Sequence, residues 1–266
     1  GWEAVGSQGF VYKLTAKDST LFSKTPHFKI VAYDKDNTAH TNGIMQIHDA
    51  EPIRISRSIT DYHTLFDLPK SKTILAFDDN QLIAYLTFGW SSNKPGIIES
   101  GGVTEGIETL IKYLLENEMT DENTQALVPL HKTTMGDLLY LKKPETRLPI
   151  ENAAGMGQQM NRINNMGILL KSMQKYFQIK SVNLNTSFSI SLTETNEIIG
   201  ILLNNGKIEI TDQKHPKHIN LNRRNLTQVI FGSHSNIPEV EMNLDIKNIF
   251  DSIFPYHFTI WPLDRC

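Results

Sequence analysis

Two short apolar runs lie at the start of the chain, separated by glycine and polar residues. Residues 1–6 and 10–14 each contain Trp, Val, Phe or Tyr near their centre, and Gly6-Ser7-Gln8-Gly9 lies between them. These residue types favour strands, so the pattern predicts a strand–turn–strand hairpin. A hairpin alone cannot bury its faces, and we therefore expect residues 1–14 to pack against a larger body.

The middle of the chain alternates between strand-like and helix-like patterns. Residues 15–27 are polar and predict a linker. Between Ile107 and Leu115, apolar residues recur at i, i+3, i+4, i+7 and i+8, which predicts an amphipathic helix; a shorter helix is expected at 62–68. Strands are expected at 28–33, 43–48, 53–58, 73–77, 82–88, 96–99 and 126–130.

The last hundred residues change character. A helix face is expected from Ile163 to Phe177, and two further helices are expected at 221–231 and 244–253. Asn204-Asn205-Gly206 is a hairpin signal between two apolar runs. The strands expected here are 187–192, 198–203 and 207–210.

Composition narrows the classes of function. The 266 residues carry 26 Lys and Arg against 29 Asp and Glu, a net charge of −3, which gives no general attraction to nucleic acid or to anionic membranes. Cys266 is the only cysteine, which excludes an internal disulfide and a cysteine-based zinc site. No apolar run approaches the ~20 residues that span a membrane. We therefore expect a cytoplasmic protein without nucleic-acid or membrane partners.

Four local phrases and the order of the expected elements resemble one family. The phrases are Gly1-Trp2-Glu3, Met160–Asn165, Leu226–Gly232 and Ile260–Arg265, and the order strand, strand, strand, helix, strand recurs between residues 73 and 130. Together they resemble GNAT acetyltransferases of the enhanced-intracellular-survival (Eis) type. That family joins a catalytic GNAT domain, a second GNAT-like domain and a sterol-carrier-like domain.

The resemblance implies a fold class of α/β plus α+β. A GNAT-like mixed-sheet domain at 28–165 would be followed by a sterol-carrier-like domain at 166–266. Residues 1–14 would be the closing strands of an N-terminal GNAT domain that lies outside this chain, and 15–27 the linker after them.

The resemblance also implies a function. The chain would be the C-terminal, non-catalytic part of an acetyl-CoA-dependent N-acetyltransferase, where it shapes the acceptor site and the assembly of the parent enzyme. The implied partners are the missing N-terminal GNAT domain and an amine substrate, with a homo-oligomer left open. Acetyl-CoA would bind in the missing domain, so no cofactor is expected in this chain, which would be inactive alone.

Two glycine-rich segments are candidates for a cofactor loop. Catalytic GNAT domains hold the pyrophosphate with an Arg/Gln-x-x-Gly-x-Gly/Ala loop at a helix N-terminus. At the matching position Ser100–Gly106 lacks the Arg or Gln, and Glu105 would repel phosphate, so we predict a structural remnant. Asn152–Gly157 matches better except at Asn152, but it follows no expected strand, which favours a loop between domains.

The chain end is the one catalytic candidate. In the resembled family the terminal carboxylate serves as general base, which here would be the carboxylate of Cys266. The family usually ends with an aromatic or aliphatic residue, so a docking tail without a catalytic part is the alternative. As a thiol nucleophile, Cys266 would need a neighbouring base.

A rival function comes from another class. Sterol-carrier-like folds can hold an apolar ligand between sheet and helices, so the last domain could be a hydrophobic-ligand carrier of the lipid or sterol type. The same side chains could equally form a packed core. They are Phe188, Ile190, Leu192, Ile199, Ile201 and Leu203.

Three weaker patterns favour ordinary structure. His215-Pro216-Lys217-His218 predicts a solvated loop rather than a metal site, because no acidic or cysteine partner is nearby. Asp34–Thr38 resembles the start of a calcium loop, but Ala39 and Met45 stand where glycine and glutamate are needed. Arg223-Arg224 predicts a solvated helix face.

Overall fold

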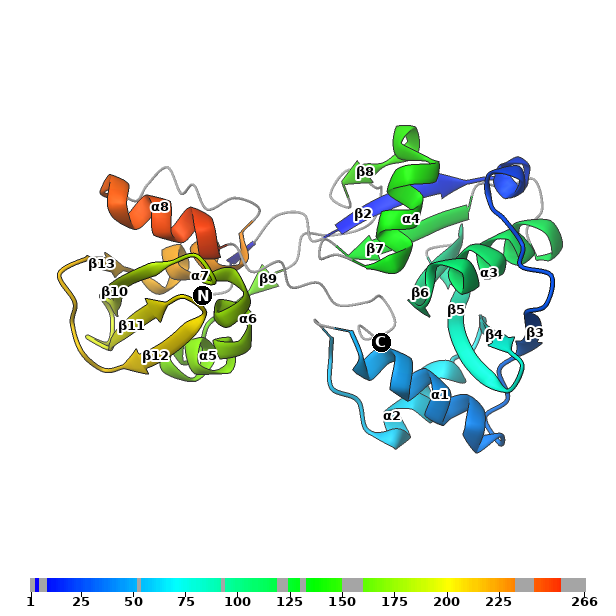
Figure 1. The fold of residues 1–266 in the computed structure, drawn as a ribbon, viewed down its shortest axis with the longest axis horizontal. Coiled ribbons are helices and arrows are strands. Elements are labelled where there is room, and N and C mark those ends of the chain that lie inside the picture. The colour runs from blue at the N-terminus through cyan, green and yellow to red at the C-terminus, as the bar shows by residue number, and fades with distance from the viewer. Residues whose placement is uncertain are drawn as a thin grey trace. The chain divides into compact units, whose positions relative to one another are not determined.

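The chain forms two compact units, which are described separately below. Within the described residues, one unit contains a sheet of seven strands and the other a sheet of four strands, and we name the units accordingly. Figure 1 shows their elements. The computed structural model describes residues 3–4, 9–51, 54–91, 94–118, 124–129, 133–149, 160–232 and 242–254.

The seven-stranded unit is built on a mixed sheet. Neighbouring strands are antiparallel except β6 and β7, which run parallel and pair at only two positions, Gly96 with Gln125 and Ile97 with Ala126. In spatial order the strands are β3 (Lys29–Ala32), β4 (Ser71–Asp78), β5 (Gln81–Ser91), β6 (Lys94–Gly102), β7 (Thr124–Pro129), β2 (Gly9–Leu14) and β8 (Leu148–Pro149).

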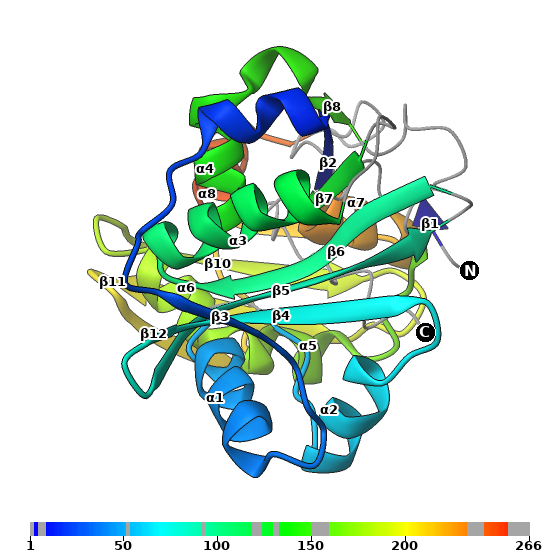
Figure 2. The same cartoon turned by 90° about the vertical axis from the view of Figure 1, so that its right-hand side faces the viewer.

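Helices cover both faces of this sheet. α1 (Thr38–Asp49) and α2 (Ile59–Phe66) lie on one face, and α3 (Thr104–Asn117) lies on the other (Figure 2). Each face has its own apolar cluster, one around Tyr62 and Tyr85 and one around α3. The remaining helices are α4 (Thr134–Lys142) and the short 3-10 helices η1 (Ala16–Leu21) and η2 (Pro144–Thr146).

α3 follows directly from its sequence. All five apolar positions that predicted it, from Ile107 to Leu115, are buried. Burying each of these side chains stabilises the fold by roughly 1.5–3 kcal/mol. The expected strands at 73–77, 82–88, 96–99 and 126–130 are also present, as β4, β5, β6 and β7.

The predicted hairpin of residues 1–14 is wrong. β1 (Glu3–Ala4) pairs with β9 (Met160–Asn161) in the four-stranded unit, whereas β2 pairs with β7 and β8 in the seven-stranded sheet. The reason is visible in β2, where Val11, Tyr12 and Leu14 are all buried. A strand with both faces buried belongs in a larger sheet that is covered on both sides. A two-stranded hairpin of residues 1–14 would not provide that cover.

The segment predicted as a polar linker is instead a packed element. η1 lies within residues 15–27, and Phe22 behind it is buried. The Ser23 N–H donates to Glu108 Oε1 (2.8 Å), and Lys112 Nζ donates to the carbonyl oxygens of Ser19 and Phe22 (3.3 and 3.0 Å). Polar side chains of α3 thus hydrogen-bond to the backbone of this segment, which is not a solvated linker.

Two further expected strands are also corrected. Residues 43–48 belong to α1, which Asn37 caps by accepting a hydrogen bond from the Ala39 N–H (3.1 Å). Its buried residues Thr41, Ile44 and His48 follow helical rather than strand spacing. Residues 54–58 have no regular secondary structure. α4 was not predicted.

The four-stranded unit carries the hairpin that the sequence indicated. Asn205 and Gly206 both have positive φ (47° and 82°), as a tight two-residue hairpin turn requires. β10 and β13 are parallel and the other pairs antiparallel. The sheet order is β12 (Lys207–Thr211), β11 (Ile198–Asn204), β10 (Asn185–Leu192) and β13 (His218–Leu221).

Helices pack on one apolar core in this unit. The expected helix at 163–177 is two helices, because the chain leaves helical geometry at Met173. The helices are α5 (Met166–Ser172), α6 (Gln174–Lys180), α7 (Arg223–Phe231) and α8 (Leu244–Ile253). Among the described residues of both units, no helix combines the length and hydrophobicity that a membrane crossing requires.

Candidate functional site

The junction of β6 and α3 carries Ser100–Gly106, the predicted remnant of a cofactor loop. Gly102 has φ +115°, and a Cβ at this position would lie 2.1 Å from the Ile83 carbonyl oxygen. The next residue, Val103, donates its N–H to that same oxygen (3.0 Å). Only glycine fits this turn, and the Val103 N–H is already used within the fold.

The residues on either side of the turn are packed as tightly. A Cβ at Gly106 would lie 2.7 Å from the Ala84 Cβ, so α3 rests directly on β5. Ser100 is buried, and its hydroxyl contacts the Met135 sulfur (3.3 Å). The glycines of this segment therefore have a packing role whether or not a ligand binds.

A cavity of about 430 Å³ adjoins the junction. It is lined by the end of α1, the start of β5, the N-cap residue of α3 (Val103) and the N-cap and first residue of α4. The partial positive charge of these two helix N-termini attracts anions. The described residues that line it include no Lys or Arg; they are Gln46, Ile47, Ala50, Glu51, Gln81, Leu82, Ile83, Gly102, Val103, Thr133 and Thr134.

Acidic groups oppose an anion at this cavity. Glu51 lines it, and Glu105 lies in the first turn of α3. At the start of α4 the Thr133 hydroxyl already accepts the Gly136 N–H (3.0 Å). The described lining thus offers two helix dipoles but not the basic side chains with which proteins usually bind a diphosphate.

A buried polar cluster lies on the opposite face of the sheet from α3. Arg57 donates from Nη1 to Glu99 Oε1 (2.9 Å) and from Nη2 to Oε2 (2.6 Å). Tyr85 Oη donates to Glu99 Oε1 (2.8 Å). The Arg57 and Glu99 side chains are only 1% and 0% exposed, so this two-pronged ion pair is shielded from water.

Two more side chains extend the cluster. The Arg57 guanidinium carbon lies 5.6 Å from the centre of the Tyr62 ring, and the Tyr62 hydroxyl is 2.8 Å from His48 Nδ1. Burial, with a smaller contribution from Asp49, raises the pKa of Tyr62 to about 12. Burial and the charge of Glu99 raise the pKa of Tyr85 well above its ordinary value. Both phenols are therefore protonated at neutral pH.

The sequence reasoning missed this cluster. Arg57 lies on an expected half-buried strand and Glu99 closes an apolar run, and the two are 42 residues apart. The available signal was Glu99 immediately before Ser100-Gly101-Gly102. A Cβ at Gly101 would lie 2.6 Å from Tyr85 Cε1, so the glycine makes room for the tyrosine ring beside the glutamate.

The other predicted site residues have local roles or lie outside the described residues. Asn152–Gly157 and Cys266 are in the second group. His218 lies on β13, with its Nδ1 2.8 Å from Ser189 Oγ. Asp34 accepts the Asp36 N–H (3.0 Å) in the turn before α1. Among the residues described, no three His, Cys, Asp or Glu side chains gather as a metal site would require.

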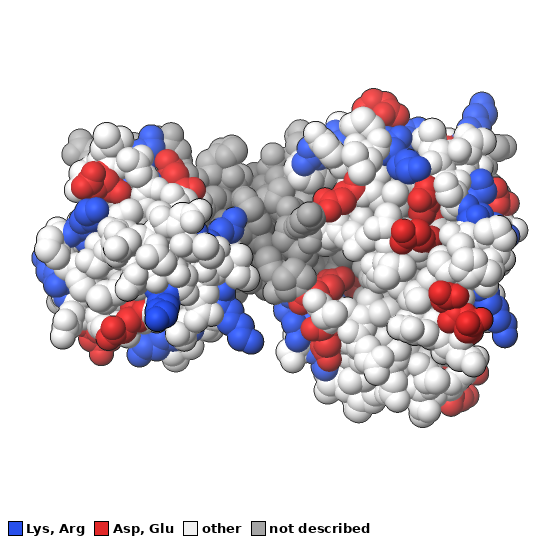
Figure 3. Space-filling view, in the orientation of Figure 1, with Lys and Arg blue, Asp and Glu red and all other residues white. Residues whose placement is uncertain are grey.

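Arg223 and the mixed surface need no special function. The Arg223 N–H donates to Glu194 Oε1 (2.8 Å) at the start of α7. Lys and Arg alternate with Asp and Glu over the face seen in Figure 3, without one large patch of a single sign. On that face the arrangement is typical of a solvated surface.

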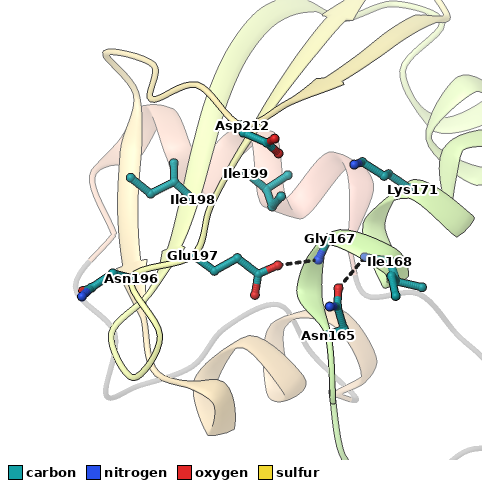
Figure 4. Close-up of a pocket in the computed structure, with 9 residues that line it drawn as sticks. All are labelled: Asn165, Gly167, Ile168, Lys171, Asn196, Glu197, Ile198, Ile199 and Asp212. Atoms are coloured by element: carbon teal, nitrogen blue, oxygen red, sulfur yellow. Dashed lines mark hydrogen bonds between the residues drawn. The ribbon is translucent and has the colours of Figure 1, made fainter.

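A cavity of the four-stranded unit is lined by both polar and apolar residues. It measures about 540 Å³ and lies beside the start of α5 (Figure 4). Glu197 Oε1 accepts the Gly167 N–H (2.9 Å), and Asn165 Oδ1 accepts the Ile168 N–H (2.7 Å). These side chains satisfy the first N–H groups of α5 and are not free to hold a ligand.

The apolar residues considered for a lipid tunnel lie in the packed core. All six, from Phe188 to Leu203, are buried within one cluster. The Phe250 ring stacks edge-on against Phe188 (5.6 Å between centroids) and against Phe254 (5.4 Å). In the described part of this unit these rings pack within one cluster of buried side chains, most of them aliphatic.

The comparisons with known proteins bear on the fold. No protein-family model matches the chain, and no curated protein matches it. A GCN5-related N-acetyltransferase from Anabaena variabilis shares the fold with a TM-score of 0.66 at 13% identity, over 96% of this chain and 66% of its own. A probable N-acyltransferase from Enterococcus faecalis gives 0.64 at 14%, over 96% and 66%.

A third solved structure carries the family name that the sequence suggested. Eis1 from Mycobacterium abscessus matches with a TM-score of 0.61 at 12% identity, over 98% of this chain and 68% of its own. The chain spans 66% of the length of the first two neighbours. Its mixed α/β architecture is thus GNAT-like, and its structural neighbours include GCN5-related N-acetyltransferases and a mycobacterial Eis protein.

Proposed function

We propose that this chain is the C-terminal, non-catalytic part of a cytoplasmic, acetyl-CoA-dependent N-acetyltransferase of the Eis type. The seven-stranded unit would be its second GNAT-like domain and the four-stranded unit its sterol-carrier-like domain. Together they would shape the amine-acceptor site and the assembly of the parent enzyme. Support comes from the GNAT-like fold and from the larger size of the structural neighbours.

One observation carries the non-catalytic role. The cavity at the start of α3 has Glu51 in its described lining and Glu105 beside it, but no basic residue. A diphosphate brought there would meet the Glu51 carboxylate in the lining, with that of Glu105 in the adjoining turn of α3, and like charges oppose binding. Acetyl-CoA would therefore bind in another part of the parent enzyme.

Calorimetry with acetyl-CoA tests this role. The chain should give no heat of binding, whereas an enzyme that also carries the proposed catalytic domain should bind acetyl-CoA and acetylate an amine. A matched variant, Glu51→Lys with Glu105→Gln, adds a cation beside the two helix N-termini and should gain weak affinity. Micromolar binding to the unmodified chain would overturn the proposal.

The chain end is a separate part of the proposal. The carboxylate of Cys266 would act as general base in the parent enzyme, or the tail would only dock. One residue added after Cys266 moves the carboxylate without removing the tail. If the carboxylate transfers a proton, turnover should fall more than acetyl-CoA affinity. Unchanged turnover would leave docking as its only role.

A further inference from the structure

Arg57 is bound to the sheet in the way that a small cationic ligand is bound to a receptor. Its guanidinium carbon lies 5.6 Å from the centre of the Tyr62 ring, and both of its terminal nitrogens donate to the single carboxylate of Glu99. We propose that Glu99, Tyr85 and Tyr62 form a binding site for a guanidinium group, which Arg57 occupies from within the same chain.

The residues that bind the guanidinium group, Glu99 and Tyr85, lie on two paired strands of the sheet. Glu99 lies on β6 and Tyr85 on β5, two antiparallel strands whose pairing shifts register between Thr87 and Phe88, beside Glu99. Tyr85 Oη holds Glu99 Oε1 at 2.8 Å, and Gly101 leaves the space that its ring fills. The carboxylate is therefore oriented before any cation arrives, which lowers the entropic cost of binding.

The chemistry selects a planar cation. Glu99 presents both oxygens to two parallel N–H donors at 2.9 and 2.6 Å, a geometry that a guanidinium matches and an ammonium does not. The Tyr62 ring adds a cation–π contact. Removing the Arg57 cation leaves a buried carboxylate that lacks these contacts. The empty site should therefore bind another guanidinium cation.

The segment that carries Arg57 has less regular structure than the strands that carry Glu99 and Tyr85. Residues 54–58 have no regular secondary structure, and Arg57 is the only fully buried residue among them. Its neighbours Arg54, Ser56 and Ser58 are exposed. Arg54 pairs with Asp49 at the surface (3.2 Å) and donates from Nη1 to the Glu51 carbonyl oxygen (3.0 Å). The segment can thus lose the Arg57 side chain while the strands that form the receptor keep their own pairing.

Chemical rescue tests the site. Arg57→Ala removes the side chain from Cγ outward, which corresponds to ethylguanidinium, so ethylguanidinium is the probe. The variant should unfold about 10 °C below wild type. Ethylguanidinium in the millimolar range should restore at least half of that loss, along a curve that saturates. Ethylurea, a neutral molecule of similar shape, should restore none.

Three controls separate a binding site from a general solvent effect. Wild type should show no saturable shift, because Arg57 already fills the site. Arg54→Ala removes an arginine from the same segment but from an exposed pair, and ethylguanidinium should not stabilise it. Arg57→Ala with Glu99→Gln removes the carboxylate charge and should abolish the rescue.

The opposite results would overturn the proposal. They are an Arg57→Ala protein that ethylguanidinium does not stabilise, or one that ethylurea stabilises equally, or equal shifts in wild type and Arg54→Ala. Should Arg57→Ala not fold, Arg57→Gln retains part of the side-chain volume, and the same titration then applies: folding or stabilisation that depends on ethylguanidinium supports the site, and insensitivity to it contradicts the site.

Discussion

The carboxylate of Asp18 accepts a hydrogen bond from Lys143 Nζ, and this contact joins η1 to the C-cap residue of α4. Asp18 also accepts the N–H and the hydroxyl of Thr15 (2.7 and 3.0 Å), which closes a capping box at the start of η1. One nearly buried carboxylate thus both shapes η1 and fastens it to the seven-stranded unit.

Asp18→Asn should weaken this attachment. The amide keeps the size of the side chain but loses the charge that faces Lys143, so we expect a loss of about 1–3 kcal/mol in the free energy of unfolding. Urea denaturation measures it. Asp67→Asn is the matched control, because its pair with Lys35 is exposed on both sides and should change stability by less than about 0.5 kcal/mol. Equal losses in the two variants would contradict the role assigned to Asp18.

The same attachment predicts a dependence on acid. Burial alone would raise the pKa of Asp18, but hydrogen bonds from Lys143 and Thr15 outweigh it and lower the pKa. Glu108 behaves in the same way. Burial alone would raise its pKa, but hydrogen bonds from Lys142 and from the Ser23 N–H outweigh burial and lower the pKa. Carboxyls with lowered native pKa values stabilise the fold above their unfolded pKa values and lose this contribution as pH falls through the native ones.

The measurement is unfolding free energy against pH for wild type and for Asp18→Asn with Glu108→Gln. The difference between them should be constant above about pH 5 and shrink toward zero as the pH falls below about 4, the ordinary range of these carboxyls. A difference that persists undiminished at pH 2 would show that the two carboxylates do not act through their charge.

The β6–α3 turn predicts a large effect from one methyl group. Gly102→Ala would place Cβ 2.1 Å from the Ile83 carbonyl oxygen at φ +115°, so it combines backbone strain with a clash against a sheet backbone. We expect a loss of at least about 3 kcal/mol, measured by thermal unfolding. Gly206→Ala is the matched control: φ is +82°, but the nearest atom is 3.5 Å away, so strain alone should cost about 1 kcal/mol. Similar losses at both glycines would mean that the clash is relieved.

Local signals account for the elements that the sequence predicted correctly. α3 was visible because its apolar stripe needs no knowledge of the partner strand, and the β11–β12 hairpin because Asn205-Gly206 fits positive φ. α1 was not, because Gly43–His48 also looks apolar at strand spacing. The helix is favoured there by the Asn37 cap and by the packing of Ile44 against the sheet.

Long-range contacts account for what the sequence did not predict. The polar residues of 15–27 look like a linker until Glu108 and Lys112, some 85 to 93 residues away, supply partners for its backbone. The ion pair of Arg57 and Glu99 also depends on a long-range contact, because the two residues are 42 positions apart in the sequence. A charge on an expected strand is ordinarily a solvated one, and only the pairing of β5 with β6 brings Tyr85 and Glu99 together over Gly101.

The last prediction concerns the core of the four-stranded unit and the rival function of a lipid carrier. Phe250 is fully buried and contacts Phe188 and Phe254 edge-on, so Phe250→Ala should open a cavity and cost about 3–5 kcal/mol. Leu244→Ala on the same helix is the control, because Leu244 is 71% exposed and should change stability by less than about 0.5 kcal/mol. Thermal unfolding of both variants provides the comparison.

Mass spectrometry of the purified proteins then separates core from tunnel. A packed core predicts that the unmodified chain carries no lipid, and that only Phe250→Ala has room for a small apolar molecule. If Phe250→Ala cost almost nothing and the unmodified chain retained a lipid, the aromatic residues would be lining a ligand site. Phe250 would then report on ligand exchange rather than on stability, and the carrier function would replace the packed core as the account of this unit.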